Sequence, residues 1–128
     1  MLIVDDHPMV REGLRSMLSV PEIEVVGEAA AAEEALARAG ALAPDVVMLD
    51  IQLADADGLA VLRRLKAALP QTSVLMVTMH ANAEFVREAV RSGAAGYVLK
   101  GITRRELIAA VHAVRGASLW ADSRPQPP

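Results

Sequence analysis

The sequence of 128 residues contains no cysteine and only three aromatic residues: one Trp, one Tyr and one Phe. Without cysteine the chain can form no disulfide, thiolate nucleophile or cysteine-based zinc site, which is consistent with a reducing cytoplasm. Hydrophobic residues nevertheless make up 53% of the chain. With so few aromatics among them, the core is expected to be aliphatic and closely layered.

Long apolar runs and clustered positive charge are also missing. No apolar stretch approaches the about 18 residues of a membrane-spanning helix and no signal peptide is apparent, so we expect a cytoplasmic protein without a membrane partner. The formal net charge is −3, and Lys and Arg are scattered along the chain. Because phosphate contacts need clustered positive charge, this segment is not expected to bind nucleic acid by itself.

Five short apolar segments alternate with longer segments of helical period. The apolar segments at 45–50 and 73–78 hardly alternate, as is typical of central parallel strands covered on both faces. Right-handed crossovers then predict an α/β fold: a five-stranded parallel sheet with helices on both faces, in the flavodoxin-like strand order 2-1-3-4-5. The expected strands are 1–5, 23–29, 45–50, 73–78 and 96–100; the expected helices begin at Pro8 and cover 31–42, 58–69, 83–92 and 103–115.

Signals at the helix ends support these boundaries. The motif "TRRE" is a capping box in which Thr103 and Glu106 satisfy each other's backbone donors. Gly93 and Gly116 stand where helices need a left-handed stop. The tail "SRPQPP" has the composition of a linker. We therefore place one domain at 1–118 and the start of an interdomain linker at 119–128.

Polar residues follow four of the five predicted strands, and they form a coherent chemical set. The carboxyl ends of parallel strands meet at one edge of the sheet, where ligands bind. Neighbouring carboxylates about 4 Å apart repel by roughly 4 kcal/mol at an effective dielectric near 20, which a cation would offset. Oxygen ligands suit a hard divalent ion, and lysine and threonine can contact an added phosphoryl group. The residues are Asp5, Asp6, Asp50, Thr78 and Lys100.

From residue 1 to about 120, the chain resembles the receiver domains of two-component response regulators. The motifs that carry the resemblance are "LIVDDH", "DVVMLD" with Gly58 eight residues past Asp50, "VLMVT" and "SGAAGYVLK", in the family's order and spacing. The sequence is most similar to the NarL/FixJ type, with its LuxR-type output. The resemblance implies a Mg²⁺-dependent domain that a cognate sensor histidine kinase phosphorylates on Asp50.

The resemblance also implies roles for the residues around Asp50. Asp6 would be a direct magnesium ligand beside Asp50, Asp5 the outer acid, and the backbone carbonyl of Gln52 a further ligand. Thr78 and Lys100 would engage the phosphoryl oxygens.

Tyr97 would be the aromatic that changes rotamer when the domain is activated. On the same resemblance, the chain is a signalling domain that assists its own phosphotransfer and dephosphorylation and turns over no external substrate. Its output would be transcription through a carboxyl-terminal helix-turn-helix outside this chain, and only that domain would contact DNA. Homodimerisation on phosphorylation would be one way of activating it.

Two other functions remain as alternatives, and a third is excluded. A stand-alone receiver would act through protein contacts. An aspartyl-phosphate hydrolase would use the same nucleophile. Such enzymes resemble a D-x-D arrangement in which the second Asp is the acid and base, and this chain has Gln52 at that position. A dinucleotide-binding module is excluded because no G-x-G-x-x-G follows the first strand.

Several residues are expected to be less informative. His7, His80 and His112 lie far apart in the pattern, and we expect none of them to bind a metal. Trp120 is expected to cover the edge of the core. Gly101 follows Lys100 where many receivers have a cis proline; because a cis peptide there would cost about 2.5–4 kcal/mol, we predict trans.

Overall fold

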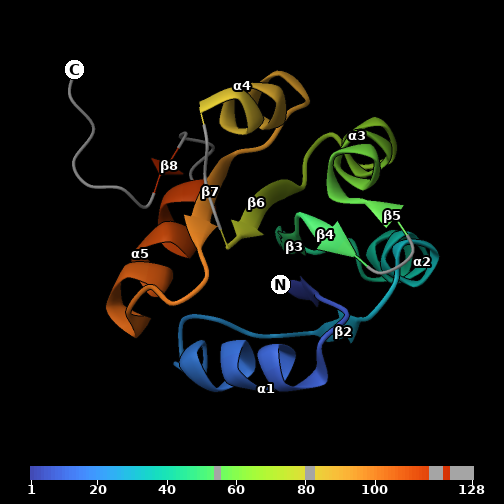
Figure 1. The fold of residues 1–128 in the computed structure, drawn as a ribbon. Helices are drawn as coiled ribbons and strands as arrows, with labels where there is room; N and C mark the ends of the chain where they lie inside the picture. Colours follow the sequence, from blue (N-terminus) through green and yellow to red (C-terminus); the bar gives the residue numbers. More distant parts are fainter. Residues whose placement is uncertain (54–55, 80–82, 116–119, 122–128) are drawn as a thin grey trace.

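A parallel sheet runs through the middle of the molecule, with helices on both faces (Figure 1). The computed structural model describes residues 1–53, 56–79, 83–115 and 120–121. The strand order β2-β1-β3-β6-β7-β8 contains the predicted five-stranded order, which is confirmed, and adds one strand at the edge. The strands are β1 (Leu2–Val4), β2 (Gly27–Ala29), β3 (Val46–Asp50), β6 (Ser73–Thr78), β7 (Gly96–Leu99) and β8 (Trp120–Ala121).

The helices pack into two hydrophobic clusters, one on each face of the sheet, and Figure 1 shows them on both sides of it. Helices α1 (Pro8–Met17) and α5 (Arg104–Arg115) contribute to one cluster, and α2 (Ala32–Leu42), α3 (Gly58–Ala68) and α4 (Ala83–Arg91) contribute to the other. Their bounds agree with the predicted helices to within one or two residues. None of the helices in the described part of the chain is both long and apolar enough to cross a membrane.

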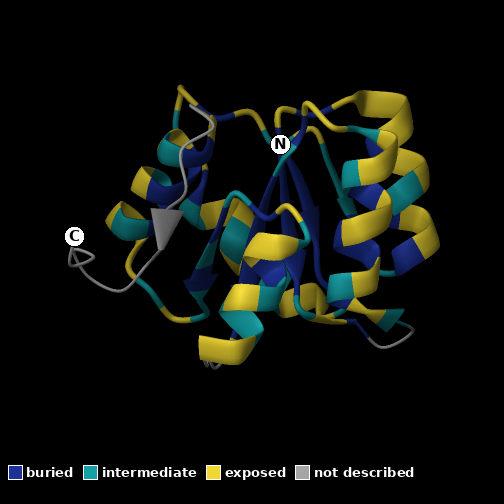
Figure 2. Ribbon diagram, turned by 90° about the horizontal axis from the view of Figure 1, so that it is seen from above, coloured by how far each residue is buried: buried dark blue, intermediate teal, exposed yellow. Residues whose placement is uncertain are grey.

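The hydrophobic core consists of two clusters, one on each side of the sheet. Alternate residues of β3 enter opposite clusters: Val46 and Met48 join the side chains of α1 and α5, which we call the α1/α5 cluster. Val47 and Leu49 join those of α2 and α3, which we call the α2/α3 cluster. All five residues of β3 are buried, and Figure 2 shows the strands as the dark centre of the molecule. The central strand is thus a rigid support for the residue at its end, Asp50.

The helix ends largely follow the predicted signals. The backbone NH of Thr103 donates to Glu106 Oε1 at 3.0 Å, and the NH of Glu106 donates to Thr103 Oγ1 at 3.1 Å, so the capping box is confirmed. Gly93 has a φ of +104°, the left-handed conformation expected after α4. The Lys100–Gly101 peptide is trans, as predicted. The stop expected at Gly116 lies outside the described residues.

Three features of the sheet were not predicted. The second strand begins at Gly27, opposite Leu2, so residues 23–26 lie outside it, although the Val26 NH donates to the Met1 carbonyl at 2.9 Å. A short antiparallel pair, β4 (Gln52–Leu53) and β5 (Ala56–Asp57), follows β3. The edge strand β8 pairs with Gly96 and Tyr97. Nothing is described of the Trp120 side chain, and the domain boundary at 118 stays a prediction.

Candidate functional site

Residues from four strand ends meet at the carboxyl edge of the sheet. Asp5 follows β1, Asp50 ends β3, Thr78 ends β6 and Lys100 follows β7. The Lys100 Nζ lies 3.2 Å from Asp5 Oδ2 and 3.3 Å from Asp50 Oδ2. Asp5, Asp50 and Thr78 are buried, at 1%, 3% and 2% exposure. The structure thus brings together four of the residues that the sequence singled out, because parallel strands share one carboxyl edge.

The turn after Asp50 is held by backbone hydrogen bonds. The NH of Ile51 donates to the Val77 carbonyl at 3.0 Å, and the NH of Gln52 donates to Asp50 Oδ1 at 3.2 Å. The NH of Gly58, the first residue of α3, donates to the Ile51 carbonyl at 2.8 Å. These bonds fix the direction of the Asp50 carboxylate, and they hold the first residue of α3 against the turn that follows Asp50.

The surroundings of the site raise the pKa values of both Asp50 and Lys100. Burial raises the pKa of the Asp50 carboxyl above its ordinary value, and the charge of Asp5 raises it further, against the opposing effects of the Gln52 NH and Lys100. Burial lowers the pKa of Lys100, but its contacts with Asp5 and Asp50 outweigh burial and raise that pKa overall. Lys100 therefore stays an ammonium ion that neutralises part of the carboxylate charge.

The acids at this edge are suited to a divalent cation. Ligand atoms from Asp5, Asp6, His7 and Asp50 all lie within 4.8 Å of one another. The buried oxygens Asp5 Oδ2 and Asp6 Oδ1 accept no well-aligned hydrogen bond in the described residues, but Lys100 Nζ lies 3.2 Å from the first and His7 Nδ1 3.0 Å from the second. Three carboxylates around one ammonium leave an excess of negative charge, which a divalent cation would offset. Carboxylate oxygens are ligands that suit Mg²⁺.

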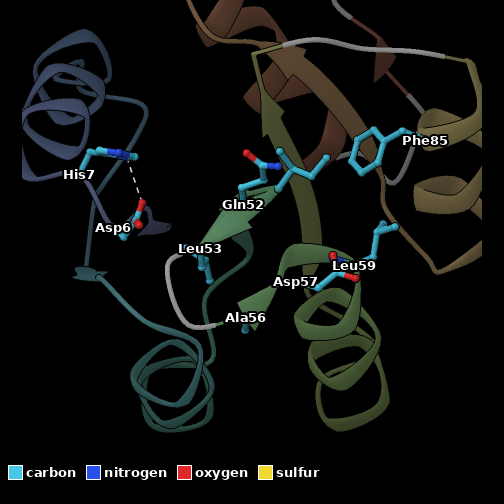
Figure 3. Close-up of a pocket in the computed structure, with 9 residues that line it drawn as sticks. Asp6, His7, Gln52, Leu53, Ala56, Asp57, Leu59 and Phe85 are labelled. Carbon is cyan, nitrogen blue, oxygen red and sulfur yellow. Dashed lines mark hydrogen bonds and ion pairs between the residues drawn. The ribbon is translucent and has the colours of Figure 1, made fainter.

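His7 also lies beside the acids, although the sequence interpretation assigned it no role there. Its Nδ1 lies 3.0 Å from Asp6 Oδ1, the contact drawn in Figure 3, and 3.1 Å from Asp5 Oδ1. Its backbone NH also donates to Asp5 Oδ1 at 2.9 Å, which curls the chain so that the ring faces the acids. The adjacency of a histidine to two strand-end acids was the available signal. His112 is exposed on α5, and His80 lies outside the described residues.

Two adjoining pockets open beside the acids. One, of about 310 Å³, is lined by His7, Asp50, Ile51, Gln52, Thr78, Met79, Phe85 and Lys100. The other, of about 600 Å³, shares several of these residues and extends over β4, β5 and the start of α3 (Figure 3). Phe85, from α4, lines both pockets and was not predicted at the site. The acceptor candidate Asp50 is thus accessible from outside although its side chain is buried.

Tyr97 lies apart from the acids on β7. It is half-buried and packs against the α2/α3 cluster. In the register of β6 and β7, Tyr97 pairs with Met76 and Leu99 pairs with Thr78. Residues two apart on a strand share a face, so Tyr97 and Thr78 lie on the same side of the sheet.

Comparison with known proteins agrees with this geometry. Residues 1–112 match the family model of the response regulator receiver domain. The chain is 41% identical over 123 residues to the DNA-binding transcriptional activator DevR/DosR of Mycobacterium tuberculosis, which covers 95% of this chain and 57% of that protein. The chain therefore spans a little over half the length of this relative.

Solved structures give the same result. A LuxR-family response regulator from Aurantimonas superposes with a TM-score of 0.88 at 36% identity, covering 94% of this chain and 86% of that one. The isolated REC domain of RcsB from Salmonella enterica, determined with the phosphomimetic BeF3⁻, superposes with a TM-score of 0.85 at 25% identity, covering 94% and 90%. With its fold, its acidic strand ends and these matches, the chain belongs to the response regulator receiver domain family.

Proposed function

We propose that this chain accepts a phosphoryl group on Asp50. The observation that carries the proposal is the placement of the Asp50 carboxylate. It ends a strand whose five residues are all buried, faces a pocket of about 310 Å³, and receives the Gln52 NH on one oxygen and Lys100 on the other. A carboxylate oriented in this way can attack phosphorus, forming an acyl phosphate as the bond to the donor breaks.

Mg²⁺ is the proposed cofactor. Asp6, Asp50 and the backbone carbonyl of Gln52 would hold the ion, with Asp5 as the outer acid. The excess of acids over lysine at this edge of the sheet supports this assignment. When bound, Mg²⁺ supplies positive charge that neutralises the oxygens of the transferring group.

Lys100 and Thr78 are the proposed contacts to the new phosphoryl group. Lys100 already lies against Asp50 Oδ2, so it can follow charge that develops there. Thr78 lines the same pocket from the neighbouring strand. Its movement toward the phosphoryl oxygens would leave space for Tyr97, which lies on the same side of the sheet. A local change of charge would thereby alter the surface near α4 and β7.

The partners proposed for the chain follow from its family. A cognate sensor histidine kinase would donate the phosphoryl group from a phosphohistidine in the cytoplasm. DevR/DosR is a DNA-binding transcriptional activator and is longer than this chain, which favours a transcriptional output through a further domain. Phosphorylation would act on that domain by relieving masking or by promoting homodimerisation.

A hydrolase that turns over phosphate esters is disfavoured. Such enzymes resemble a D-x-D arrangement in which the second Asp is the acid and base, and its position here holds Gln52, an exposed amide that cannot transfer a proton at neutral pH. The chain should therefore stop at one phosphoryl group and lose it slowly.

Incubation with acetyl phosphate and Mg²⁺, followed by intact mass spectrometry, tests the proposal. The wild type should gain one phosphoryl group, and Asp50→Asn should gain none. Asp45→Asn is the matched control, because Asp45 is exposed and precedes the opposite end of the same strand. Equal labelling of Asp50→Asn and Asp45→Asn would refute the assignment.

A further inference from the structure

We propose that Arg11 is a positioning residue for the Mg²⁺ site, because its guanidinium group holds the peptide that joins Asp5 to Asp6. The inference rests on the metal site proposed above and deepens it. Arg11 lines neither of the two pockets beside the acids. It would therefore act through the position of the acids and not by contact with a phosphoryl donor.

Arg11 bridges the end of β1 and the neighbouring strand β2. Its Nη1 donates to the backbone carbonyl of Asp5, and its Nε donates to Glu28 Oε1 on β2 at 3.1 Å. The Arg11 side chain is only 17% exposed, so water has little access to these bonds. A guanidinium group carries five NH donors in fixed directions within one plane, so a single side chain can hold two partners. Arg11 thus ties the Asp5 carbonyl to a second strand.

The start of α1 places Arg11 where its side chain can reach back to the acids. The helix begins at Pro8, and the Arg11 NH donates to the His7 carbonyl at 3.0 Å, which closes the first turn. Side chains on a helix lean toward its amino terminus. The Arg11 side chain therefore extends toward the residues that precede the helix, and its guanidinium group meets the Asp5 carbonyl there.

The direction of the Asp5 carbonyl determines where Asp6 lies. A trans peptide is planar, so the oxygen of Asp5, the NH of Asp6 and the Asp6 Cα share one plane. The Asp5 NH is held as well, since it donates to the Ala29 carbonyl of β2 at 3.1 Å. Asp6 is the proposed direct ligand, and Mg²⁺ demands near-ideal octahedral geometry. A shift of the peptide that carries Asp6 should therefore weaken Mg²⁺ binding.

The charge of Arg11 has the opposite effect on the metal. A fixed cation near the acids repels a second cation, so its removal by itself should strengthen Mg²⁺ binding. Glu28 offsets part of this charge, because its carboxylate contacts both Arg11 and Arg15. Loss of Arg11 should thus raise the Mg²⁺ affinity if only its charge matters, and lower it if its hydrogen bonds position Asp6. The sign of the change separates the two roles.

Calorimetric titration of the 128-residue chain with Mg²⁺, at one fixed pH and ionic strength, tests the proposal. Arg11→Ala should lower the Mg²⁺ affinity by about tenfold or more, the usual loss when a group behind a metal ligand is removed. With acetyl phosphate as donor, this variant should need correspondingly more Mg²⁺ to reach half of its maximal phosphorylation rate. At saturating Mg²⁺ its rate should approach that of the wild type, because Asp50 and Lys100 are untouched.

Arg15→Ala is the matched control. Arg15 lies one helical turn further along α1, and its Nη1 contacts Glu28 Oε2 at 2.7 Å. Within the described residues it bonds to Glu28 and not to Asp5, so it ties α1 to β2 without holding the acids. Its loss should not lower the Mg²⁺ affinity.

A second variant, Arg11→Lys, keeps the charge of Arg11. A single ammonium replaces the planar group that spans the Asp5 carbonyl and Glu28. This variant should therefore bind Mg²⁺ more weakly than the wild type although its charge is the same. It also decides the question if Arg11→Ala fails to fold.

Three results would overturn the inference. The first is a Mg²⁺ affinity of Arg11→Ala that equals or exceeds that of the wild type, and the second is wild-type affinity in Arg11→Lys. The third is an equal loss of affinity in Arg11→Ala and Arg15→Ala, which would assign both arginines to a general link between α1 and β2. Failure of the metal site itself is distinguishable, because the wild-type chain would then bind no Mg²⁺.

Discussion

Replacing Gly58 with alanine tests how closely α3 packs beneath the turn that follows Asp50. A β-carbon on Gly58 would lie 2.7 Å from the backbone oxygen of Asp50, and closer still to that of Ile51. Backbone oxygens cannot rotate away as a flexible side chain can. The alanine therefore forces the turn and the start of α3 apart, and it strains the hydrogen bond from the Gly58 NH to the Ile51 carbonyl.

The magnitude follows from two opposing effects. Forcing an extra carbon into a packed site costs about 1–3 kcal/mol, and the preference of helices for alanine over glycine returns about 0.5–1 kcal/mol. The free energy of unfolding should thus fall by about 1 kcal/mol at the centre of these ranges and by up to about 2.5 kcal/mol, which corresponds to roughly 3–10 °C in Tm for a domain of this size. Gly40→Ala is the matched control, since Gly40 is exposed within α2 and a β-carbon there would meet nothing within 4 Å.

Urea unfolding and thermal melting of both variants measure the effect. Gly40→Ala should be more stable than the wild type by about 0.5–1 kcal/mol, because only the helix preference acts there. Gly58→Ala should be less stable, and it should accept phosphate from acetyl phosphate more slowly because the turn beside Asp50 has moved. A Gly58→Ala variant as stable as Gly40→Ala would show that the packing argument is wrong.

Two further substitutions examine the proposed metal and the proposed switch. Asp6→Asn should remove most of the rise in Tm that Mg²⁺ causes, since an ion that binds only the folded state stabilises it by RT ln(1 + [L]/Kd). Without Mg²⁺ the variant should be no less stable than the wild type, because one of the repelling charges is gone. A clear loss of stability without Mg²⁺ would make Asp6 a structural residue. Thr78→Ala should still be phosphorylated but should lose the phosphorylation-dependent NMR shifts of residues 83–100. Thr78→Ser, which keeps the hydroxyl, should retain these shifts. Unchanged shifts in the alanine variant would contradict the proposed role of Thr78 in the conformational change.

The parts of the fold that the sequence predicted are those set by long-range periodicity. The continuous apolar runs at 46–49 and 74–77 are typical of strands buried on both faces, and a helix between two such strands returns the chain to a parallel neighbour. Once the strands are parallel, their carboxyl ends must share an edge. The meeting of Asp5, Asp50 and Lys100 was therefore predictable without any side-chain geometry.

The parts that the sequence did not predict depend on short-range contacts. The strands β4 and β5 have two residues each, too few to show a period, and they exist because the turn after Asp50 folds back on itself. The loss of residues 23–26 from the second strand follows from the register of β1, which no local pattern encodes. The position of His7 also depends on a short-range contact, because the bond from its NH to Asp5 places the ring beside the acids.

The two faces of the sheet have different parts in the proposed signal. By the alternation of β3, Asp50 continues the series of Val46 and Met48 on the α1/α5 side. Thr78 continues the series of Met76, on the side where Tyr97 and Ala89 of α4 pack. A phosphoryl group on Asp50 would add negative charge to a site where Lys100 does not neutralise all of the carboxylates. The Thr78 hydroxyl belongs to the neighbouring strand and lines the same pocket as Asp50. A response of Thr78 to that charge would therefore cross from one face to the other, toward α4, through packed residues that leave little room for gradual movement.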